Sequence, residues 1–328
     1  MPVTEAHIDE LEERGFVVIP GFLSPDEIAA AQEGLWEVYP KPEGFFAHPE
    51  KYPTFETPMR GLQNYPWSSF ALNRLPLHPG LLDAAERILG TPDIQLCKAE
   101  LLAKYAGAAD YEQDLHRDYG NHTLVVPRQD GRWRELTTIL YLDDVTPENA
   151  APAFVPRMHT DGIKLGHTQL PDQSLRAFEE QATGPAGSLV LYFYDVFHRA
   201  VRFAEGHYAR FVLFADYRQT DMVWTGKHAF PVAGNRPPMN ELVERIDARQ
   251  RTVLGFPAPG HEYWNEQTLA DTQIRYPNID LEAYREAMKK GETTSLRQTA
   301  ATAEQAKCAK DTKAEHDFRR TVWGELSG

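Results

Sequence analysis

The spacing of hydrophobic and polar positions changes twice along the chain. The part up to about residue 92 contains several predicted helices; in the first, Ile8 and Leu11 are apolar positions three residues apart, as in an amphipathic helix. From there to about residue 220, short apolar runs alternate with turn residues, which is typical of strands. The pattern then becomes polar and helical again. We therefore expect one domain over residues 1–328, with a helix-rich part (1–92), a β-rich core (93–220) and a helical extension (221–328).

The first elements carry clear end signals. Thr4 suits a helix N-cap, and Gly15 ends that helix before a short apolar strand at 16–19. Ser24 opens a second helix, because Pro follows it directly and Glu follows three residues later. The aromatic segment 40–75 has weak periodicity and is expected to wall a pocket. Further helices are expected at 81–89, 241–249, 281–290 and 302–320, although the stretch 293–313 could instead be a mobile tail.

Six short runs in the centre of the chain are rich in β-branched and aromatic residues: Ile94–Tyr105, Leu136–Leu142, Ala153–Val155, Ser188–Tyr194, His198–Phe203 and Tyr208–Tyr217. Turn residues separate them, which predicts an all-β sandwich or barrel. The last two runs are joined by only four residues, so we expect them to pair as a hairpin.

Two histidines and one aspartate are placed where they can share a metal ion. His116 and Asp118 are two residues apart, so on an extended backbone their side chains point to the same face. His198 begins a strand further along the chain. Two His and one carboxylate on one face of an octahedral ion are diagnostic of non-haem Fe(II) oxygenases. The three remaining positions suit a chelating 2-oxoacid and dioxygen.

A His-x-Asp tripeptide alone is a weak signal, because loop histidines and surface aspartates are common. His207 is the chief rival to His198, but it follows Glu205-Gly206 and therefore resembles a turn residue. The other histidines in this half are more simply interpreted as surface or hydrogen-bonded structural residues: His122, His159, His167 and His228.

Arg210 lies across the expected hairpin from the second histidine. A guanidinium can bind a carboxylate through two parallel hydrogen bonds, so Arg210 is expected to hold the distal carboxylate of 2-oxoglutarate. Arg202 lies roughly 13 Å from that histidine along the strand, and Arg199 points to the opposite face. Lys104 and Thr138 are candidates for a second donor to the 2-oxoacid.

These motifs together resemble the phytanoyl-CoA dioxygenase family of Fe(II)/2-oxoglutarate oxygenases. The resemblance runs from about Ile8 to Tyr217 and includes the opening segment Leu11–Leu23, Lys104 ahead of the His-x-Asp tripeptide, and Arg210. It departs in one loop, where the family's Gly and Pro-Gly-Ser-His read Ala150-Ala151-Pro152 and Pro156-Arg157-Met158-His159. That loop borders the substrate region in the family.

The resemblance implies a mainly β fold, a double-stranded β-helix (a cupin-like jelly roll over residues 93–220) with flanking N- and C-terminal helices. It also implies Fe(II), 2-oxoglutarate and O2 as cofactors, and hydroxylation of an unactivated C–H bond of a small-molecule substrate, with succinate and CO2 as co-products. The same chemistry could instead desaturate, epoxidise or cyclise. A non-catalytic jelly-roll binding protein is the alternative of another class, which the presence of Asp118, His198 and Arg210 disfavours.

Charge and composition narrow the partners. The net charge of −14, from 34 basic and 48 acidic residues, argues against nucleic-acid binding. Arg128, Arg132 and Arg134 form the nearest basic cluster, which is either a solvated loop or a site for an anionic substrate group. Two distant cysteines give no disulfide framework and fit a reducing compartment. Without a run of about 18 apolar residues, we expect a cytoplasmic protein with no membrane partner. Its oligomeric state stays open.

Overall fold

The computed structural model describes residues 2–52, 61–108, 110–128, 130–160, 162–169, 174–206, 208–234 and 236–290. The chain divides into two compact units, Met1–Phe256 and Pro257–Gly328. The larger unit extends past the expected end of the β core at residue 220, because it also includes α7 (Pro237–Arg245) and α8 (Ala248–Val253). The smaller unit includes α9 (Glu266–Arg275) and α10 (Glu282–Lys290). The helix expected at 302–320 lies outside the described residues.

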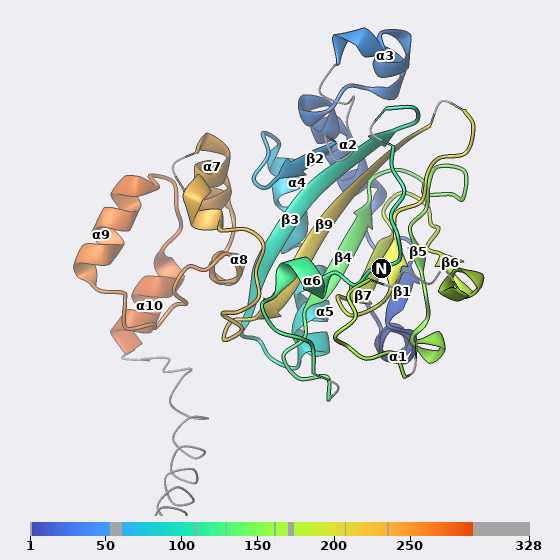
Figure 1. Ribbon diagram of the computed structural model, residues 1–328. Helices are drawn as coiled ribbons and strands as arrows, with labels where there is room; N and C mark the ends of the chain where they lie inside the picture. Colours follow the sequence, from blue (N-terminus) through green and yellow to red (C-terminus); the bar gives the residue numbers. More distant parts are fainter. Residues whose placement is uncertain are drawn as a thin grey trace, which may run out of the picture. The chain divides into compact units, whose positions relative to one another are not determined.

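The main sheet of the larger unit is antiparallel and has six strands in the order β1-β7-β4-β9-β3-β2 (Figure 1). The strands are β1 (Phe16–Ile19), β2 (Leu62–Asn64), β3 (Ile94–Tyr105), β4 (Leu136–Tyr141), β7 (Leu189–Phe193) and β9 (Ala209–Gln219). Every residue of β4 and β7 is buried. Both faces of the sheet are therefore covered, which explains why these strands are continuous apolar runs instead of alternating ones.

A smaller antiparallel sheet has the order β6-β5-β8, formed by β5 (Ala153–Phe154), β6 (Glu180–Gln181) and β8 (His198–Arg199). The expected hairpin between 198–203 and 208–217 is wrong. β8 pairs with β5, whereas β9 pairs with β3 and β4. The intervening chain passes from one sheet to the other, because the long β9 buries more surface between β3 and β4 than beside the two-residue β8.

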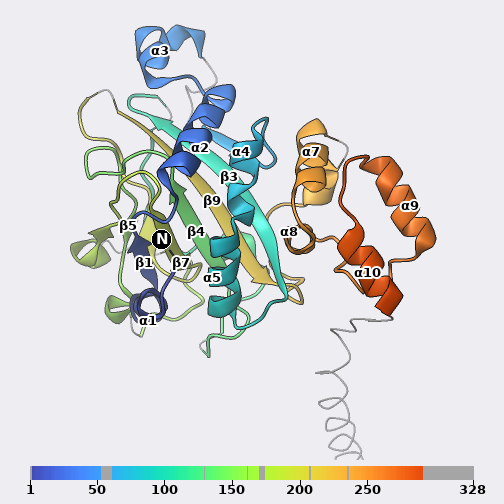
Figure 2. The same ribbon diagram turned by 180° about the vertical axis from the view of Figure 1, so that it is seen from behind.

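Helices cover one face of the main sheet, the face seen in Figure 2. They are α2 (Pro25–Val38), α4 (Phe70–Asn73) and α5 (Pro79–Leu89). Odd-numbered positions of β9 point to this side; the hydroxyl of Tyr217, for example, donates to the carbonyl of Pro76. Even-numbered positions point to the opposite face, where the candidate site lies. The remaining helical elements of the larger unit are α1 (Glu5–Arg14), α3 (Pro42–Ala47), α6 (Tyr119–His122), and the 3-10 turns at Pro49–Lys51, Leu75–Leu77, Arg157–His159, Ser174–Phe178 and Phe230–Ala233.

The end signals predicted for the first helices are confirmed. The Thr4 hydroxyl accepts the amide of His7, and Gly15 ends α1 with φ 83°. Ser24 and Glu27 form a capping box at α2. The helix expected at 241–249 is instead two helices, because Asp247 caps a new one. Within the described part of the chain, no helix is long and apolar enough to cross a membrane.

Candidate metal centre

The backbones of His116 and His198 are hydrogen-bonded to each other. The amide of each residue donates to the carbonyl of the other, and both distances are 3.0 Å. This bridge places the two imidazoles side by side, with ring centroids 4.5 Å apart. Phe154, the partner of His198 in the small sheet, stacks on the His198 ring at 5.5 Å. The small sheet and the His-x-Asp segment thus fix two imidazoles together.

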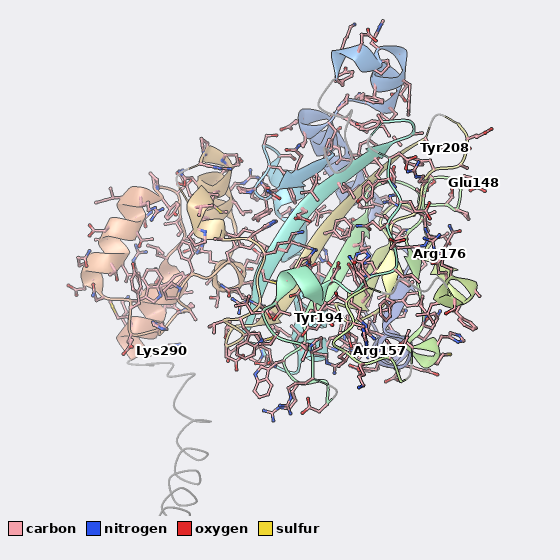
Figure 3. The ribbon with its side chains drawn as sticks, in the orientation of Figure 1. Glu148, Arg157, Arg176, Tyr194, Tyr208 and Lys290 are labelled. Carbon is pink, nitrogen blue, oxygen red and sulfur yellow. The ribbon has the colours of Figure 1, made fainter. Side chains whose placement is uncertain are left out.

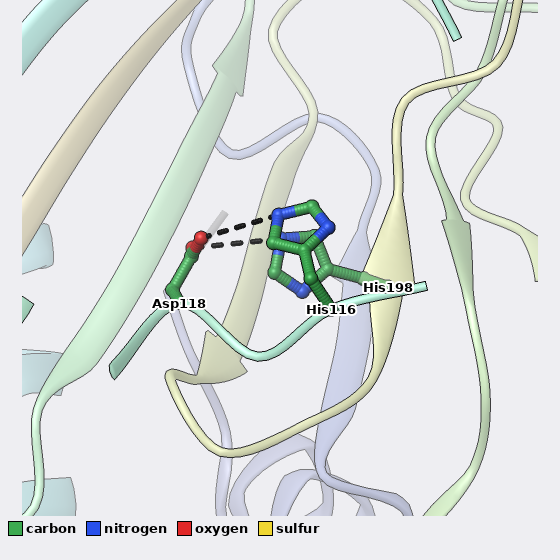
Figure 4. Close-up of side chains that lie close together, drawn as sticks. All are labelled: His116, Asp118 and His198. Atoms are coloured by element: carbon green, nitrogen blue, oxygen red, sulfur yellow. Dashed lines mark ion pairs between the residues drawn. The ribbon is translucent and has the colours of Figure 1, made fainter. Parts of the chain in front are cut away.

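Asp118 completes a cluster of three potential ligands (Figure 4). Its Oδ1 lies 3.5 Å from Nε2 of His116, and its Oδ2 lies 3.5 Å from Nε2 of His198. Ligand atoms at right angles, each about 2.1 Å from one ion, lie about 3 Å apart. The three side chains therefore fit a single octahedral ion with little movement.

Hydrogen bonds to the backbone orient both imidazoles. Nδ1 of His116 lies 3.0 Å from the carbonyl oxygen of Asp114, and Nδ1 of His198 lies 3.0 Å from that of Val196. A carbonyl only accepts hydrogen bonds, so each Nδ1 carries the proton. The lone pair is then on Nε2, the atom that faces Asp118.

The protonation states also suit metal binding. Burial lowers the pKa of His198 to about 4, against the opposing effect of Asp118. Burial alone would raise the pKa of Asp118, but the two histidines hold it well below its usual range. Burial would lower the pKa of His116, but Asp118 outweighs it and raises that pKa. At neutral pH the cluster therefore offers an ionised carboxylate and a neutral His198, the forms that bind metal.

Tyr192 on β7 contacts two of the three side chains. Its hydroxyl donates to Oδ2 of Asp118 at 2.8 Å, and its ring centroid lies 4.9 Å from that of His198. The side chain is buried, so its position is set by packing. A donor of this kind orients a carboxylate ligand and limits its rotation away from the ion.

Replacing Tyr192 by phenylalanine is expected to weaken Fe(II) binding by about 10- to 100-fold, because the orienting hydrogen bond to Asp118 is lost. Iron affinity and melting temperature should be measured on the same samples. Tyr217→Phe is the matched control, since it removes a buried tyrosine hydrogen bond on the helix-covered face. It should lower stability only. Equal iron affinity in Tyr192→Phe and the unmodified chain would contradict the positioning role.

A cavity of about 140 Å³ opens beside the three side chains. His116, Asp118 and His198 line it together with Arg210, and Leu62 from the 40–75 segment also lines it, as expected for that segment. Apolar residues of the main sheet, such as Ile139, form part of its wall. Arg210 therefore shares the cavity with the metal cluster, although Arg210 belongs to the main sheet and His198 to the small one.

Arg210 is a buried cation that has no ion pair among the described residues. Its Nη1 donates to the carbonyl of Ala150, and its Nε has no hydrogen-bond partner. Burial raises the pKa of the nearby Asp143 to about 8, and its carboxyl accepts the amide of Phe211 and forms no ion pair with Arg210. Burying an unpaired guanidinium is costly. An anionic ligand in the cavity would remove that cost.

Ala150 adopts a left-handed backbone conformation, with φ 69°. It lies in the segment where the family usually has glycine, and glycine adopts this conformation without strain. Alanine here costs about 1 kcal/mol. The Ala150 carbonyl accepts the hydrogen bond from Nη1 of Arg210.

Two other residues proposed from the sequence do not line the cavity. Thr138 faces the helices, where its hydroxyl donates to the carbonyl of Ala215 at 2.7 Å, and it is not among the residues that line the cavity. Lys104 lies opposite Arg210 on β3. Its Nζ donates to the carbonyl of Val201 at 2.7 Å and pairs with a carboxylate of Asp110 at 3.3 Å. The polar groups of Thr138 and Lys104 are therefore already bonded to other groups of the protein.

The rival residues are placed as follows. Arg199 lines the cavity, but two carboxylates neutralise it: those of Glu179 and Glu112, each 2.7 Å away. His122 is a buried, hydrogen-bonded histidine. His207 lies outside the described residues.

A buried ionic network next to Asp118 escaped the sequence analysis. Lys98 lies 2.7 Å from Asp216, and His122 lies 2.6 Å from Glu135. His122, Glu135 and Asp216 are close enough to hold a cation, but the Lys98 ammonium already supplies one. Burial raises the pKa of Asp216, and the Lys98 ammonium opposes this effect. Only the register of the strands could have revealed this ionic network, because Lys98 and Asp216 are more than 100 residues apart but directly paired on neighbouring strands.

Two histidines and one aspartate beside a cavity are typical of the class of non-haem iron oxygenases, and comparison with known proteins assigns the family. The model of the phytanoyl-CoA dioxygenase family matches residues 11–204, so the chain belongs to that family. The family's cofactors are Fe(II), 2-oxoglutarate and O2. The arrangement of two histidines and one aspartate is suited to this metal.

The individual proteins to which the chain is similar share low sequence identity with it. A methylphosphonate hydroxylase of Gimesia maris is 28% identical over 165 residues, which cover 49% of this chain and 59% of that protein. The crystal structure of apo HygX from Streptomyces hygroscopicus has a TM-score of 0.50 at 18% identity and covers 69% of this chain and 90% of that one. The 2-oxoglutarate-dependent carbocyclase SnoK from nogalamycin biosynthesis has a TM-score of 0.49, again at 18% identity, over 70% of this chain and 88% of its own. HygX supports a shared fold.

Proposed function

We propose that the chain is an Fe(II)/2-oxoglutarate-dependent hydroxylase that oxidises an unactivated C–H bond of a small organic substrate and releases succinate and CO2. One observation carries the proposal. His116, Asp118 and His198 converge beside a cavity that also contains a buried, unpaired arginine, Arg210. We also propose that the two sheets together form the family's double-stranded β-helix.

The residues of this chain would divide the work as follows. Nε2 of His116, the carboxylate of Asp118 and Nε2 of His198 would hold the iron. Bound there, Fe(II) supplies the oxidative chemistry with 2-oxoglutarate and dioxygen. Arg210 would bind the distal carboxylate of 2-oxoglutarate through two hydrogen bonds and so set the co-substrate's orientation. Tyr192 would keep the Asp118 carboxylate turned toward the ion.

Two observations bear on the outcome of the reaction. The chain retains the carboxylate of Asp118, which argues against halogenation, because in the related iron halogenases Gly or Ala at this place frees a position for chloride. The relative from Gimesia maris is named a hydroxylase, and the match includes about half of this chain.

Polar side chains also line the cavity near the cluster, among them Lys98, Glu100 and Lys227. A substrate with polar groups fits such a wall.

The test is turnover of 2-oxoglutarate by the full chain with Fe(II), ascorbate and oxygen, against a library of small metabolites. A true substrate should stimulate succinate release, and the product should gain one oxygen atom from isotopically labelled O2. A product that lacks two hydrogens, or contains a new ring, would replace hydroxylation by desaturation or cyclisation. Iron binding without any turnover across the library would favour the non-catalytic alternative.

A further inference from the structure

A second hollow of about 410 Å³ lies on the larger unit, and none of its lining residues lines the metal cavity. We call it the arginine groove, after Arg117, Arg128, Arg132, Arg134 and Arg157, which line it. Among the described residues, three carboxylates line it as well: those of Glu12, Asp130 and Asp195. The arginines thus outnumber the carboxylates by two among the described lining residues, on a chain whose net charge is −14.

Each of the three carboxylates is taken by one arginine. Arg134 pairs with Glu12 at 2.7 Å, Arg157 pairs with Asp195 at 2.9 Å, and Arg128 pairs with Asp130. Arg132 and Arg117 have no ion pair among the described residues. Arg117 is only 5% exposed. Its Nη1 donates to the carbonyls of Lys164 and His167, whereas its Nε has no hydrogen-bond partner.

Aromatic rings hold the guanidiniums in place. Arg134 and Arg157 both lie over the ring of Phe193, at 4.4 and 4.8 Å from its centroid. Arg132 lies over Trp133 at 4.2 Å. Arginines stacked in this way lose little conformational freedom when an oxyanion binds, so the groove is partly preorganised. Figure 3 shows Arg157 near Tyr194, another lining residue, on the lower part of the larger unit.

The backbone of the loop that forms one wall is strained. Trp133 has φ 50°, a conformation that a bulky residue rarely adopts. Its Nε1 donates to Asp221 at 3.2 Å, and the strained turn presents the ring beneath Arg132. Backbone strain of this kind is concentrated at ligand clamps and other functional sites. The solvated-loop interpretation of this basic cluster leaves that strain unexplained.

We propose that the arginine groove is a binding site for an oxyanion, specifically the phosphate group of a small phosphorylated molecule. Arg132 and Arg117 supply the unpaired charge, and Trp133 holds the guanidiniums of Arg128 and Arg132, which both lie over its ring. The arginine groove and the metal cavity share the His-x-Asp segment. Arg117 falls between His116 and Asp118 in the chain, but it lines the groove and not the cavity. The site is independent of the hydroxylase proposal.

Calorimetry of the full chain with phenyl phosphate tests this site, with phenol as the uncharged control. One phenyl phosphate should bind per chain, and phenol should not bind comparably. Arg132→Gln should weaken binding about tenfold or more, because a charge-assisted contact is lost. Arg132 is exposed, so this change does not threaten folding. Arg249→Gln, which alters an exposed arginine paired elsewhere with Asp83 and Glu86, should leave affinity unchanged.

Saturating 2-oxoglutarate should not displace the probe, because that anion is expected in the cavity with Arg210. Displacement would assign the phosphate to the cavity and overturn the groove site. Unchanged affinity in Arg132→Gln, comparable binding of phenol, or no binding by the unmodified chain would each overturn it too. None of these results bears on succinate release, so the two proposals stand or fall separately.

Discussion

Replacing His198 by alanine is expected to reduce Fe(II) affinity by more than about 100-fold and to abolish turnover of 2-oxoglutarate. Loss of an outer-shell partner alone costs 10- to 100-fold, and His198 would be one of three direct ligands. Its ring lies 10% exposed in the wall of the cavity, so water does not easily take its place. His116→Ala should behave in the same way.

Iron content after dialysis and the Fe(II) titration curve measure this effect directly. The unmodified chain should bind one Fe(II). His207→Ala is the control, because His207 was the rival ligand in the sequence, and it should retain full iron binding. Stoichiometric iron in His198→Ala, or its loss in His207→Ala, would sink the ligand assignment.

Replacing Arg210 by alanine should raise the 2-oxoglutarate concentration needed for half-maximal turnover by at least about thirtyfold. Truncating one partner of a buried charge pair costs about 2–5 kcal/mol. Iron binding should remain intact, because Arg210 contacts no metal ligand. Arg210→Lys should recover only part of the affinity, since an ammonium lacks the planar fork.

The matched control for Arg210 is Arg202→Ala. Arg202 is the next arginine upstream and does not line the cavity, so its loss should be far milder. A larger effect of Arg202→Ala than of Arg210→Ala would mean that the co-substrate's carboxylate binds elsewhere. Separate titrations of Fe(II) and 2-oxoglutarate on each variant keep the two effects apart.

Local signals in the sequence were sufficient for the helix ends and for several strands. Gly15 and Gly90 end their helices in left-handed conformations, as expected of helix-ending glycines. The run Ile94–Tyr105 is a strand with the predicted bounds. The three residues proposed as metal ligands lie close together in the structure. They could be proposed from the sequence because a two-residue spacing and a histidine at the start of a strand are properties of short segments.

Long-range pairing could not be predicted in the same way. An apolar run after a turn looks the same whether it folds back or crosses to another sheet, so the local pattern predicts the wrong partner for β9. The side of Thr138 depends on which face of β4 the helices cover, and a fully buried strand has no alternation to reveal it. The contact between Tyr192 and Asp118 depends likewise on tertiary packing.

The paired amides of His116 and His198 have a consequence for how the metal-free protein is built. The two residues are separated by 82 positions in the chain (198 − 116), and holding the ends of so long a loop together costs conformational entropy. Here the loop is closed when the protein folds, through two backbone hydrogen bonds that involve neither imidazole. An incoming ion then needs to order little more than three side chains. Substituting either imidazole should leave these amides protected against hydrogen exchange, so that the site keeps its shape when it has lost its affinity.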